Sequence, residues 1–360
     1  MKVHAINRLL VTFMVFMLSV LPTFGCKHRE RVKTSIKPPF SFVTANDLFG
    51  VDCVDPQHFC IVGLYSSIFN TSDGGTTWSQ QKSGTDLNPG DVSFVSPEEG
   101  WIAGRTGLIL HTTDGGTTWS QQKSGISNHL FAITFVDSQY GWAVGDFGSI
   151  VHTSDGGTTW QSQGFGEDRI YNDVCFVDRK HGWIAGEYGL IYHTKDSGKT
   201  WVLQECQDII PVFDETEWET FAPSLYSVCF TDTSNGWITG MDGTIIATGD
   251  GGKHWKKIPN PAEPEKVTLY KIQVIGSKGW VVGQKGTYLY SSDAGKTWQQ
   301  RKSATRTKFW LRDLNFCDTA NGIAVGSRGT ILQTADGGTT WNMLSGIPLS
   351  TKSTSPDKNI

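Results

Sequence analysis

Residues 141–160 read GWAVGDFGSIVHTSDGGTTW, and this stretch sets the pattern for most of the chain. Near-identical copies of its last six residues recur, and the tryptophans that end the copies are Trp78, Trp119, Trp160, Trp201, Trp255, Trp298 and Trp341. Successive copies are 41, 41, 41, 54, 43 and 43 residues apart. A period of about 40–45 residues is typical of the blades of a β-propeller.

Each copy contains four short strand-like segments. Around Trp142 these are residues 130–136, 141–145 and 149–153, followed by a segment that begins at Trp160. A turn sequence, Ser154-Asp-Gly-Gly157, separates the third segment from the fourth. Short strands with a turn signal every 8–12 residues indicate antiparallel sheets. We therefore expect an all-β fold, a seven-bladed β-propeller of four-stranded antiparallel blades that forms one domain over residues 44–344.

The composition excludes two broad classes of protein. Lys and Arg number 31 against 35 Asp and Glu, a net charge of −4, whereas a general nucleic-acid-binding domain is strongly basic. The hydrophobic content of 38% is enough to form a core, which excludes a wholly disordered chain. The 41 glycines and 14 tryptophans agree with many tight turns and short aromatic strands.

The N-terminus has the features of an export signal. Lys2 and Arg8 precede LLVTFMVFMLSVL at residues 9–21, which is uncharged and shorter than a membrane span of about 20 residues. Small residues then precede Cys26, as at a bacterial lipoprotein processing site. We expect a signal peptide over 1–25, lipidation of Cys26, and a tether over 26–43. This predicts a periplasmic location or the outer face of a membrane; a plain secreted protein with a free Cys26 is the alternative. Residues 345–360 are rich in Ser, Thr and Lys, which predicts a disordered tail.

The turn pattern Ser/Thr-x-Asp-x-Gly-x-Thr-Trp is the Asp-box of sialidases, sortilin-type receptors and related propellers. The longer unit, Gly-Trp-Ala-Val-Gly-x-x-Gly-x-Ile-x-x-Thr-x-Asp-Gly-Gly-x-Thr-Trp, resembles the photosystem II assembly and stability factor family. This resemblance covers about residues 44–344 and implies an exported seven-bladed propeller that binds protein. It also implies an arginine-rich patch, which would correspond here to Arg105, Arg312 and Arg328.

We interpret the aspartates of the seven turns as structural, since a turn aspartate accepts hydrogen bonds from nearby backbone N–H groups. They are Asp73, Asp114, Asp155, Asp196, Asp250, Asp293 and Asp336. A propeller spreads these positions around its ring, so they do not form a cluster of ligands. We expect neither a metal site nor a cofactor.

Two tryptophans, Trp218 and Trp310, do not belong to the repeat. Both lie in connections between blades, which in a propeller share one face with the turns between second and third strands. The Asp-box turns lie on the opposite face. We therefore predict partner binding through Trp310, Arg312, Arg328, Arg105, Lys308, Trp218 and Phe213. In the alternative, Trp218 and Trp310 only cover a blade or fill the central channel.

The charges of this face differ between its two sides. The connection between blades 4 and 5 is acidic, as are the nearby Asp146, Glu187 and Asp242, whereas the connection between blades 6 and 7 is basic. Such a pattern orients a protein partner. We predict a monomeric protein-binding scaffold, or an assembly or stability factor for a membrane or envelope complex, with no nucleic acid as partner. A carbohydrate-binding or sialidase-like glycoside hydrolase propeller is the alternative. We do not expect an enzyme, and the Arg-Ile-Pro motif of sialidases is absent from the sequence.

Cys53 and Cys60 stand where blade 3 has Phe135 and Trp142. Both aromatics became cysteine in the same blade, on strands that we expect to be adjacent. We therefore predict a Cys53–Cys60 disulfide, with two buried thiols as the alternative. The other propeller cysteines, Cys175, Cys206, Cys229 and Cys317, have no matched partner, and we expect them to be unpaired.

Overall fold

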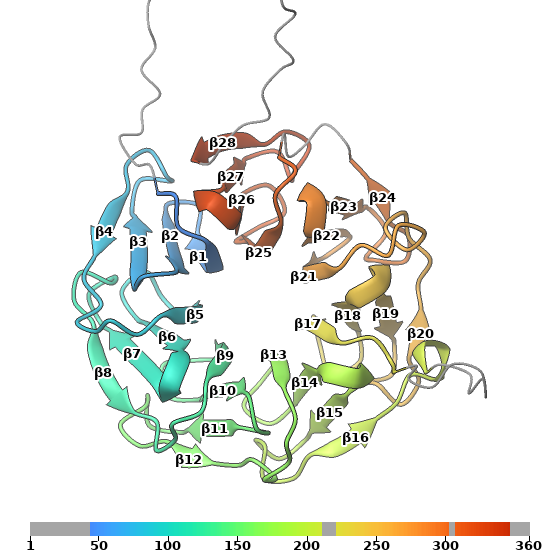
Figure 1. Cartoon of the computed structure of the whole chain (residues 1–360), viewed down its shortest axis with the longest axis horizontal. Helices are drawn as coiled ribbons and strands as arrows, with labels where there is room; N and C mark the ends of the chain where they lie inside the picture. The colour runs from blue at the N-terminus through green and yellow to red at the C-terminus, as the bar shows by residue number, and fades with distance from the viewer. Residues whose placement is uncertain (1–43, 211–220, 302–306, 346–360) are drawn as a thin grey trace, which may run out of the picture. The chain divides into compact units, whose positions relative to one another are not determined.

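A computed structural model describes residues 44–210, 221–301 and 307–345. These residues form a seven-bladed β-propeller, and each blade is a four-stranded antiparallel sheet (Figure 1). The predicted signal peptide, the tether and residues 346–360 lie outside the described residues. No helix in the described part is long and apolar enough to cross a membrane.

The strands of blades 1 to 4 are β1 (Leu48–Asp55), β2 (His58–Gly63), β3 (Ser67–Thr71), β4 (Ser79–Gln81), β5 (Pro89–Phe94), β6 (Gly100–Gly104), β7 (Leu108–Thr112), β8 (Ser120–Lys123), β9 (Leu130–Phe135), β10 (Gly141–Gly145), β11 (Ile150–Thr153), β12 (Gln161–Ser162), β13 (Tyr171–Phe176), β14 (Gly182–Gly186), β15 (Ile191–Thr194) and β16 (Val202–Gln204). Those of blades 5 to 7 are β17 (Leu225–Phe230), β18 (Gly236–Gly240), β19 (Ile245–Thr248), β20 (Lys256–Lys257), β21 (Leu269–Ile275), β22 (Lys278–Gly283), β23 (Tyr288–Ser291), β24 (Gln299–Gln300), β25 (Leu311–Phe316), β26 (Gly322–Gly326), β27 (Ile331–Thr334) and β28 (Asn342–Ser345). Short 3-10 helices are η1 (Arg105–Gly107), η2 (Glu187–Gly189), η3 (Gln207–Ile209), η4 (Met241–Gly243), η5 (Gln284–Gly286) and η6 (Ser327–Gly329).

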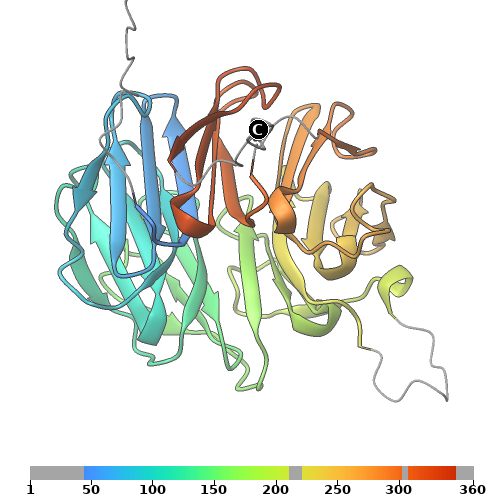
Figure 2. The same cartoon turned by 45° about the horizontal axis from the view of Figure 1, so that its top comes forward.

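Strands that follow one another in the chain are also neighbours in each sheet. The first strand of each blade lies innermost and the fourth lies outermost (Figures 1 and 2). The second strands are buried along their whole length in five-residue segments such as Gly141–Gly145. This burial on both faces explains why these segments read as continuous apolar runs rather than alternating ones.

The turn between the third and fourth strands is held by its aspartate. In blade 3, the Asp155 carboxylate accepts hydrogen bonds from the Thr159 backbone N–H at 2.9 Å and from the Thr159 hydroxyl at 2.7 Å. The Thr153 hydroxyl donates to the same carboxylate and accepts from the Gly157 N–H, each at 2.8 Å. These bonds favour the charged carboxylate and lower the pKa of Asp155. The aspartates of the other turns make the same kind of contact.

Aromatic stacking joins most neighbouring blades. Trp142 of β10 stacks on Phe176 of blade 4 with a centroid distance of 3.5 Å, and its Nε1 donates to the Ser197 carbonyl at 3.2 Å. Equivalent stacks at 3.5–3.8 Å are Trp101–Phe135, Trp183–Phe230 and Trp280–Phe316. Each of these four interfaces therefore combines apolar burial with a directional hydrogen bond from the tryptophan N–H.

Polar side chains cap the innermost strands. A first strand has one edge without a strand partner, and unpaired backbone N–H groups there are costly. Asp91 of blade 2 accepts from the Ile133 N–H of blade 3 at 2.9 Å, and Asp173 of blade 4 accepts from the Val228 N–H of blade 5 at 3.0 Å. Other blades contribute the same type of cap from Asp52, Ser93, Ser227, Gln273 and Asp313. The polar residues of the channel are therefore part of the fold.

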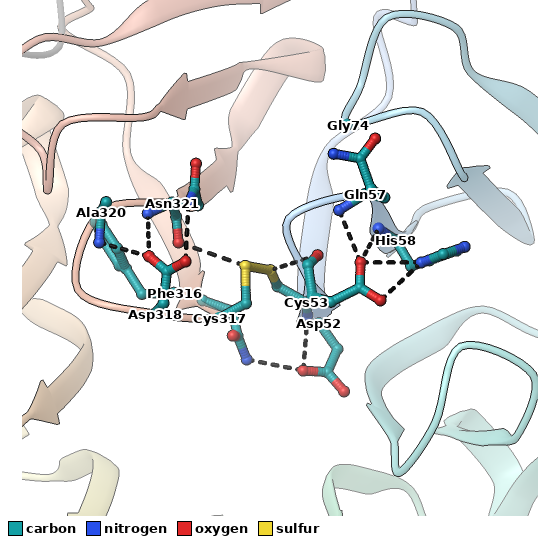
Figure 3. The surroundings of a disulfide bond; sticks show 12 residues. Asp52, Cys53, Gln57, His58, Gly74, Phe316, Cys317, Asp318, Ala320 and Asn321 are labelled. Atoms are coloured by element: carbon teal, nitrogen blue, oxygen red, sulfur yellow. Dashed lines mark hydrogen bonds and ion pairs between the residues drawn. A yellow bond between two sulfur atoms is a disulfide. The ribbon is translucent and has the colours of Figure 1, made fainter.

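A disulfide between Cys53 of β1 and Cys317, directly after β25, closes the ring (Figure 3). The two Cα atoms are 5.2 Å apart, and the two residues are separated by 264 positions in the chain. Beside it, Asn315 Nδ2 of blade 7 donates to Asp52 of blade 1 at 2.9 Å. Since β1–β4 and β25–β28 form separate sheets, the ring closes without a strand exchanged between first and last blades.

The predicted Cys53–Cys60 disulfide is wrong. Cys53 lies opposite Phe59 in the β1–β2 ladder, whereas Cys60 lies opposite Asp52. Neighbouring residues of a strand point to opposite faces, so the two sulfur atoms leave the sheet on different sides. Cys53 packs towards Ile323 and Val325 of blade 7, and Cys60 packs with Val92 and Ile102 of blade 2.

The prediction that Cys317 is unpaired is wrong for the same reason. The face of β1 that carries Cys53 is the face that meets blade 7. The free cysteines among the described residues are Cys60, Cys175, Cys206 and Cys229.

Candidate protein-binding face

The turns between second and third strands and the connections between blades make up one face, which we call the loop face. Figure 1 draws the short helices of these turns as coils. In most blades the turn reads Gly-x-x-Gly, and its third residue has a positive φ, for example 51° at Phe147 and 55° at Tyr188. Such values are uncommon outside glycine. They are held here by backbone bonds such as Gly148 N–H to the Arg169 carbonyl at 2.7 Å.

This backbone geometry directs the side chain of the third turn residue of each blade towards solvent. Tyr65 of blade 1, with φ of 56°, is 77% exposed, and Phe147 and Tyr188 are 59% and 48% exposed. The corresponding residues of blades 5 to 7 are charged: Asp242, Lys285 and Arg328. The same structural position therefore carries aromatic side chains on one part of the ring and charges on another.

Exposed hydrophobic side chains gather on the loop face. Ten large ones are exposed within the described residues, and eight of them lie in its turns and connections. Seven belong to the turns and connections of blades 3 to 5 and form what we call the apolar arc: Phe147, Phe165, Ile170, Tyr188, Ile210, Phe221 and Met241. The Tyr188 and Phe221 rings are 5.1 Å apart. Exposed apolar patches of this kind mark interaction sites in soluble proteins.

A ring of seven residues surrounds the mouth of the central channel on the loop face. They are the second residues of the innermost strands: Phe49, Gly90, Phe131, Asn172, Tyr226, Tyr270 and Arg312. Arg312 is the only charged member of this mouth ring, and its Cζ lies 5.1 Å from the Tyr270 centroid and 5.8 Å from that of Tyr226. These contacts are cation–π interactions. The centre of the face therefore offers one cation held between aromatic rings.

A layer of charged side chains, of which Asp173 and Asp313 are buried, lies directly beneath the mouth ring. Lys271 Nζ is 3.6 Å from Asp173 and 3.8 Å from Asp313. Burial opposes the charge on Lys271, but attraction to Asp173, Asp313 and Asp91 outweighs it and raises the pKa of this lysine. Burial also raises the pKa of Asp91 to about 7. No group of three or more His, Cys, Asp or Glu side chains in the described part of the chain is arranged to hold a metal ion.

The predicted binding residues that the structure describes occupy three places on this face. Trp310 is half-buried, stacked nearly parallel on Phe49 with centroids 6.4 Å apart, and its carbonyl accepts from the Ser327 N–H at 3.1 Å. The exposed Arg328 lies 4.7 Å over Phe309. These residues form one cluster where blade 7 meets blade 1, and Lys308 is exposed beside it.

Arg312 and Arg105 lie apart from that cluster. Arg312 belongs to the mouth ring, whereas the exposed Arg105 lies on η1 of blade 2. The three arginines of the expected patch therefore have three different surroundings. Trp218 and Phe213 lie outside the described residues.

Two acidic side chains of the opposite sector accept hydrogen bonds from nearby backbone N–H groups. Asp146 accepts from the His129 N–H at 2.7 Å, and Glu187 accepts from the Ile170 N–H at 3.2 Å. The centre of the predicted acidic arc, residues 211–220, is not described.

Sequence reasoning missed Tyr65, Phe147, Tyr188, Tyr226 and Tyr270. Two signals in the repeat could have identified them. The third residue of the Gly-x-x-Gly turn varies between blades, whereas both glycines are kept in six of the seven blades, and a variable residue on such a turn points to solvent. The second residue of the innermost strand also varies, and in every blade it lines the channel mouth.

Comparisons with known proteins agree with this architecture. A family model described as photosynthesis system II assembly factor YCF48 matches residues 35–124, 117–212 and 210–308. A solved structure described as YCF48 bound to D1 peptide is 22% identical, with a TM-score of 0.67, over 81% of this chain and 92% of that one. YCF48 from Cyanidioschyzon merolae is 18% identical, with a TM-score of 0.64, over 82% and 97% of the two chains.

A more distant likeness is to an enzyme. The GH74 xyloglucanase from Xanthomonas campestris is 11% identical, with a TM-score of 0.68, over 84% of this chain and 55% of that one. At such identities a structural likeness shows the fold alone. A comparison with curated protein sequences gave no match.

Proposed function

This chain belongs to the photosystem II assembly factor YCF48 family, and from that premise we propose that it is a protein-binding assembly or stability factor for a membrane or envelope complex. In this proposal the chain is exported, held at a membrane by a lipid on Cys26, and carries its partner on the loop face. The family match and the solved YCF48–D1 peptide structure support a polypeptide partner.

The observation that carries the proposal is the distribution of exposed hydrophobic side chains. Eight of the ten found in the described residues lie on the loop face, although the blades expose surface all around the ring. Buried aromatic contacts supply much of the free energy of protein interfaces, and clustering concentrates that contribution. The apolar arc is therefore the part of the face best suited to take up apolar side chains of the partner.

The charges suggest how the partner is oriented. Arg312 at the channel mouth and Arg328 at the rim favour a carboxylate on the segment that lies over blades 6, 7 and 1. The apolar arc on blades 3 to 5 favours an apolar segment there. A partner peptide that crosses the mouth ring from the basic side to the apolar side satisfies both preferences.

We do not extend the proposal to glycoside hydrolysis. A glycosidase needs two carboxyl groups placed across the scissile bond. Asp146 and Glu187 in the turns of the loop face, and Asp173 in the channel, accept hydrogen bonds from backbone N–H groups, and the fold alone accounts for that use.

Partner capture from solubilised membranes tests the proposal. The double variant Arg312→Ala/Arg328→Ala should reduce capture at least about tenfold, and Phe147→Ser/Tyr188→Ser should do so as well, because each removes one half of the proposed contact. The matched control is Lys253→Ala/Lys296→Ala, which removes the same charge from exposed positions on the Asp-box face. An equal loss in the control would contradict the proposal. Mass spectrometry of the mature N-terminus should find an acylated Cys26, and an unmodified Cys26 would remove the anchor from the proposal.

A further inference from the structure

The interface between blades 1 and 2 lacks the second-strand tryptophan that blades 2 to 6 supply at their own interfaces with the next blade. Four interfaces contain a tryptophan from the second strand stacked on a phenylalanine of the next blade. In blade 1 the tryptophan position is Cys60, whose side chain is much smaller. The phenylalanine of the next blade is still present as Phe94.

Phe94 consequently has an uncovered ring face. Its edge contact to Trp119, at 6.0 Å, matches the Phe176–Trp201 contact at 5.9 Å, so the ring sits as its counterparts do. Phe176 is 7% exposed because Trp142 covers it, whereas Phe94 is only half-buried. The exposure therefore follows from the missing indole and not from a displaced phenylalanine.

A cavity of about 380 Å³ occupies the vacated region and opens on the Asp-box side. Cys60, Phe59 and Phe94 supply apolar lining, and residues of the blade 1 and blade 2 Asp-box turns complete it. Small-molecule sites in proteins have volumes of about 300–1,000 Å³ and combine apolar walls with a few polar groups. The space is thus large enough for a planar ring.

The polar groups at this cavity match a ring that carries an N–H donor. In blade 3 the Trp142 N–H donates to the Ser197 carbonyl, and the equivalent carbonyl of blade 2 is that of Gly115. Gly115 accepts instead from Asn70 Nδ2 at 2.6 Å. Asn70 Oδ1 is then buried without a hydrogen-bond partner, although it lies on a residue that lines the cavity. An N–H group brought by a ligand would satisfy this acceptor.

The charges at the cavity select against anions. Its ionisable lining residues are Asp52, His58, Glu98 and Asp114, three carboxyl groups and one imidazole. Hydrogen bonds from Thr118 lower the pKa of Asp114, so this carboxylate is charged at neutral pH. A neutral or cationic ligand is favoured over an anionic one.

We propose that the cavity between blades 1 and 2 is a binding site for a flat, neutral or cationic aromatic ring that bears an N–H donor, with indole as the prototype. The ring would stack on Phe94 where the other blades place their own tryptophan, and its N–H would point to Asn70 Oδ1. The site lies on the Asp-box side and is independent of the partner contact proposed for the loop face.

Isothermal titration calorimetry of the full chain tests the site with indole, tryptamine and indole-3-acetate. Tryptamine and indole should bind, and indole-3-acetate should bind at least about tenfold more weakly because of its charge. Cys60→Trp restores the repeat and fills the space, so it should abolish binding. Phe94→Leu removes the stacking surface and should weaken binding at least about tenfold, which decides the question if Cys60→Trp does not fold. Cys206→Ala, at a buried cysteine of another interface, is the control and should bind as the parent chain does.

A further titration determines whether the bound aromatic ring comes from a small molecule or from a side chain of a protein partner. Binding of free indole without binding of a peptide that has an internal tryptophan assigns the site to a small molecule. Comparable binding of that peptide assigns it to a side chain of a partner. No binding of any probe, or binding that is unchanged in a folded Cys60→Trp variant, would overturn the proposal. Partner capture through the loop face should be unchanged in Cys60→Trp, so the two proposals fail separately.

Discussion

The interface between blades 3 and 4 and the interface that closes the ring between blades 7 and 1 use the same backbone positions with different chemistry. At the first, Trp142 stacks on Phe176 and donates to the Ser197 carbonyl. At the second, Ile323 stands in the tryptophan position and Cys53 in the phenylalanine position, and Cys53 is bonded to Cys317. The register of the strands decides which positions meet, and the residues there decide whether packing or a covalent bond holds the blades together.

The difference between the two interfaces follows from how the chain connects their blades. Blades 3 and 4 are joined by the chain itself, whereas blades 7 and 1 are joined only through the whole length of the propeller. A contact that closes a long loop has more chain entropy to overcome. A covalent link is therefore of greatest value at the closing interface, and the disulfide lies there.

Breaking the disulfide should have the largest effect on stability. For a link between residues 264 positions apart, chain entropy predicts a loss of about 5.5 kcal/mol in the free energy of unfolding. Urea unfolding of Cys53→Ala and of the reduced parent chain should show similar losses. Cys206→Ala, which removes a free cysteine, is the control. A parent chain whose unfolding is unaffected by reductant would contradict the role of the link.

Removing the stacked ring between blades 3 and 4 should have the next largest effect. Trp142→Ala should cost about 3–5 kcal/mol, because it leaves a cavity in a close-packed interface and an unpaired Ser197 carbonyl. Trp142→Phe keeps an aromatic ring but loses the N–H, and should cost about 1 kcal/mol for the hydrogen bond plus a smaller packing term. Denaturant midpoints at constant m-value measure both. Equal costs for the two variants would show that the hydrogen bond, and not the ring, holds these blades.

The closing interface should also respond to pH, through the carboxyl group of Asp52. Burial raises the pKa of Asp52, which bonds across the closure to Asn315, from 3.8 to about 6. The folded state therefore holds this proton more tightly than the unfolded state. The stabilisation is present at low pH and is lost as pH rises through 6.

The full pKa shift of Asp52 corresponds to at most about 3 kcal/mol in the free energy of unfolding. The partial exposure of Asp52 reduces the expected effect to about 1–2 kcal/mol. Unfolding measured between pH 4 and pH 7.5 should show this decline in the parent chain and a flatter profile in Asp52→Asn. Thr134 stands at the same strand position in blade 3, so Thr134→Val should keep the decline. A decline of the parent magnitude in Asp52→Asn would assign the titration to another group, with Asp91 the first to examine.

The sequence was sufficient for the architecture because the repeat encodes it locally. The turn aspartates, the glycines and the apolar second strands each determine their own blade, and seven copies determine the number of blades. Trp310 and Arg312 were correctly assigned to the loop face for the same reason, since a position in the repeat implies a face of the propeller.

What the sequence could not supply was the direction in which each side chain leaves its strand. The prediction for Cys53 and Cys60 assumed that an aligned Phe and Trp face one another within a blade. In the structure each faces a neighbouring blade, as Trp142 and Phe176 do. The mouth ring was missed for the same reason, because the sequence does not show side-chain directions. Tyr226 and Tyr270 become neighbours of Arg312 only when three separate blades meet.

Because the first and last blades are separate sheets, the chain is suited to circular permutation, in which the old ends are joined and new ends are opened elsewhere. In propellers whose last blade borrows a strand from the N-terminus, the position of the chain ends is built into the architecture. Here every blade is a contiguous segment. New ends could therefore be opened at any connection between blades, with the old ends joined, and all seven sheets would stay complete. The Cys53–Cys317 disulfide would then link two blades that are consecutive in the chain. The newly opened interface would have no disulfide across it. In this propeller the fold therefore does not require that the chain start at blade 1. The disulfide lies at the interface between the present first and last blades.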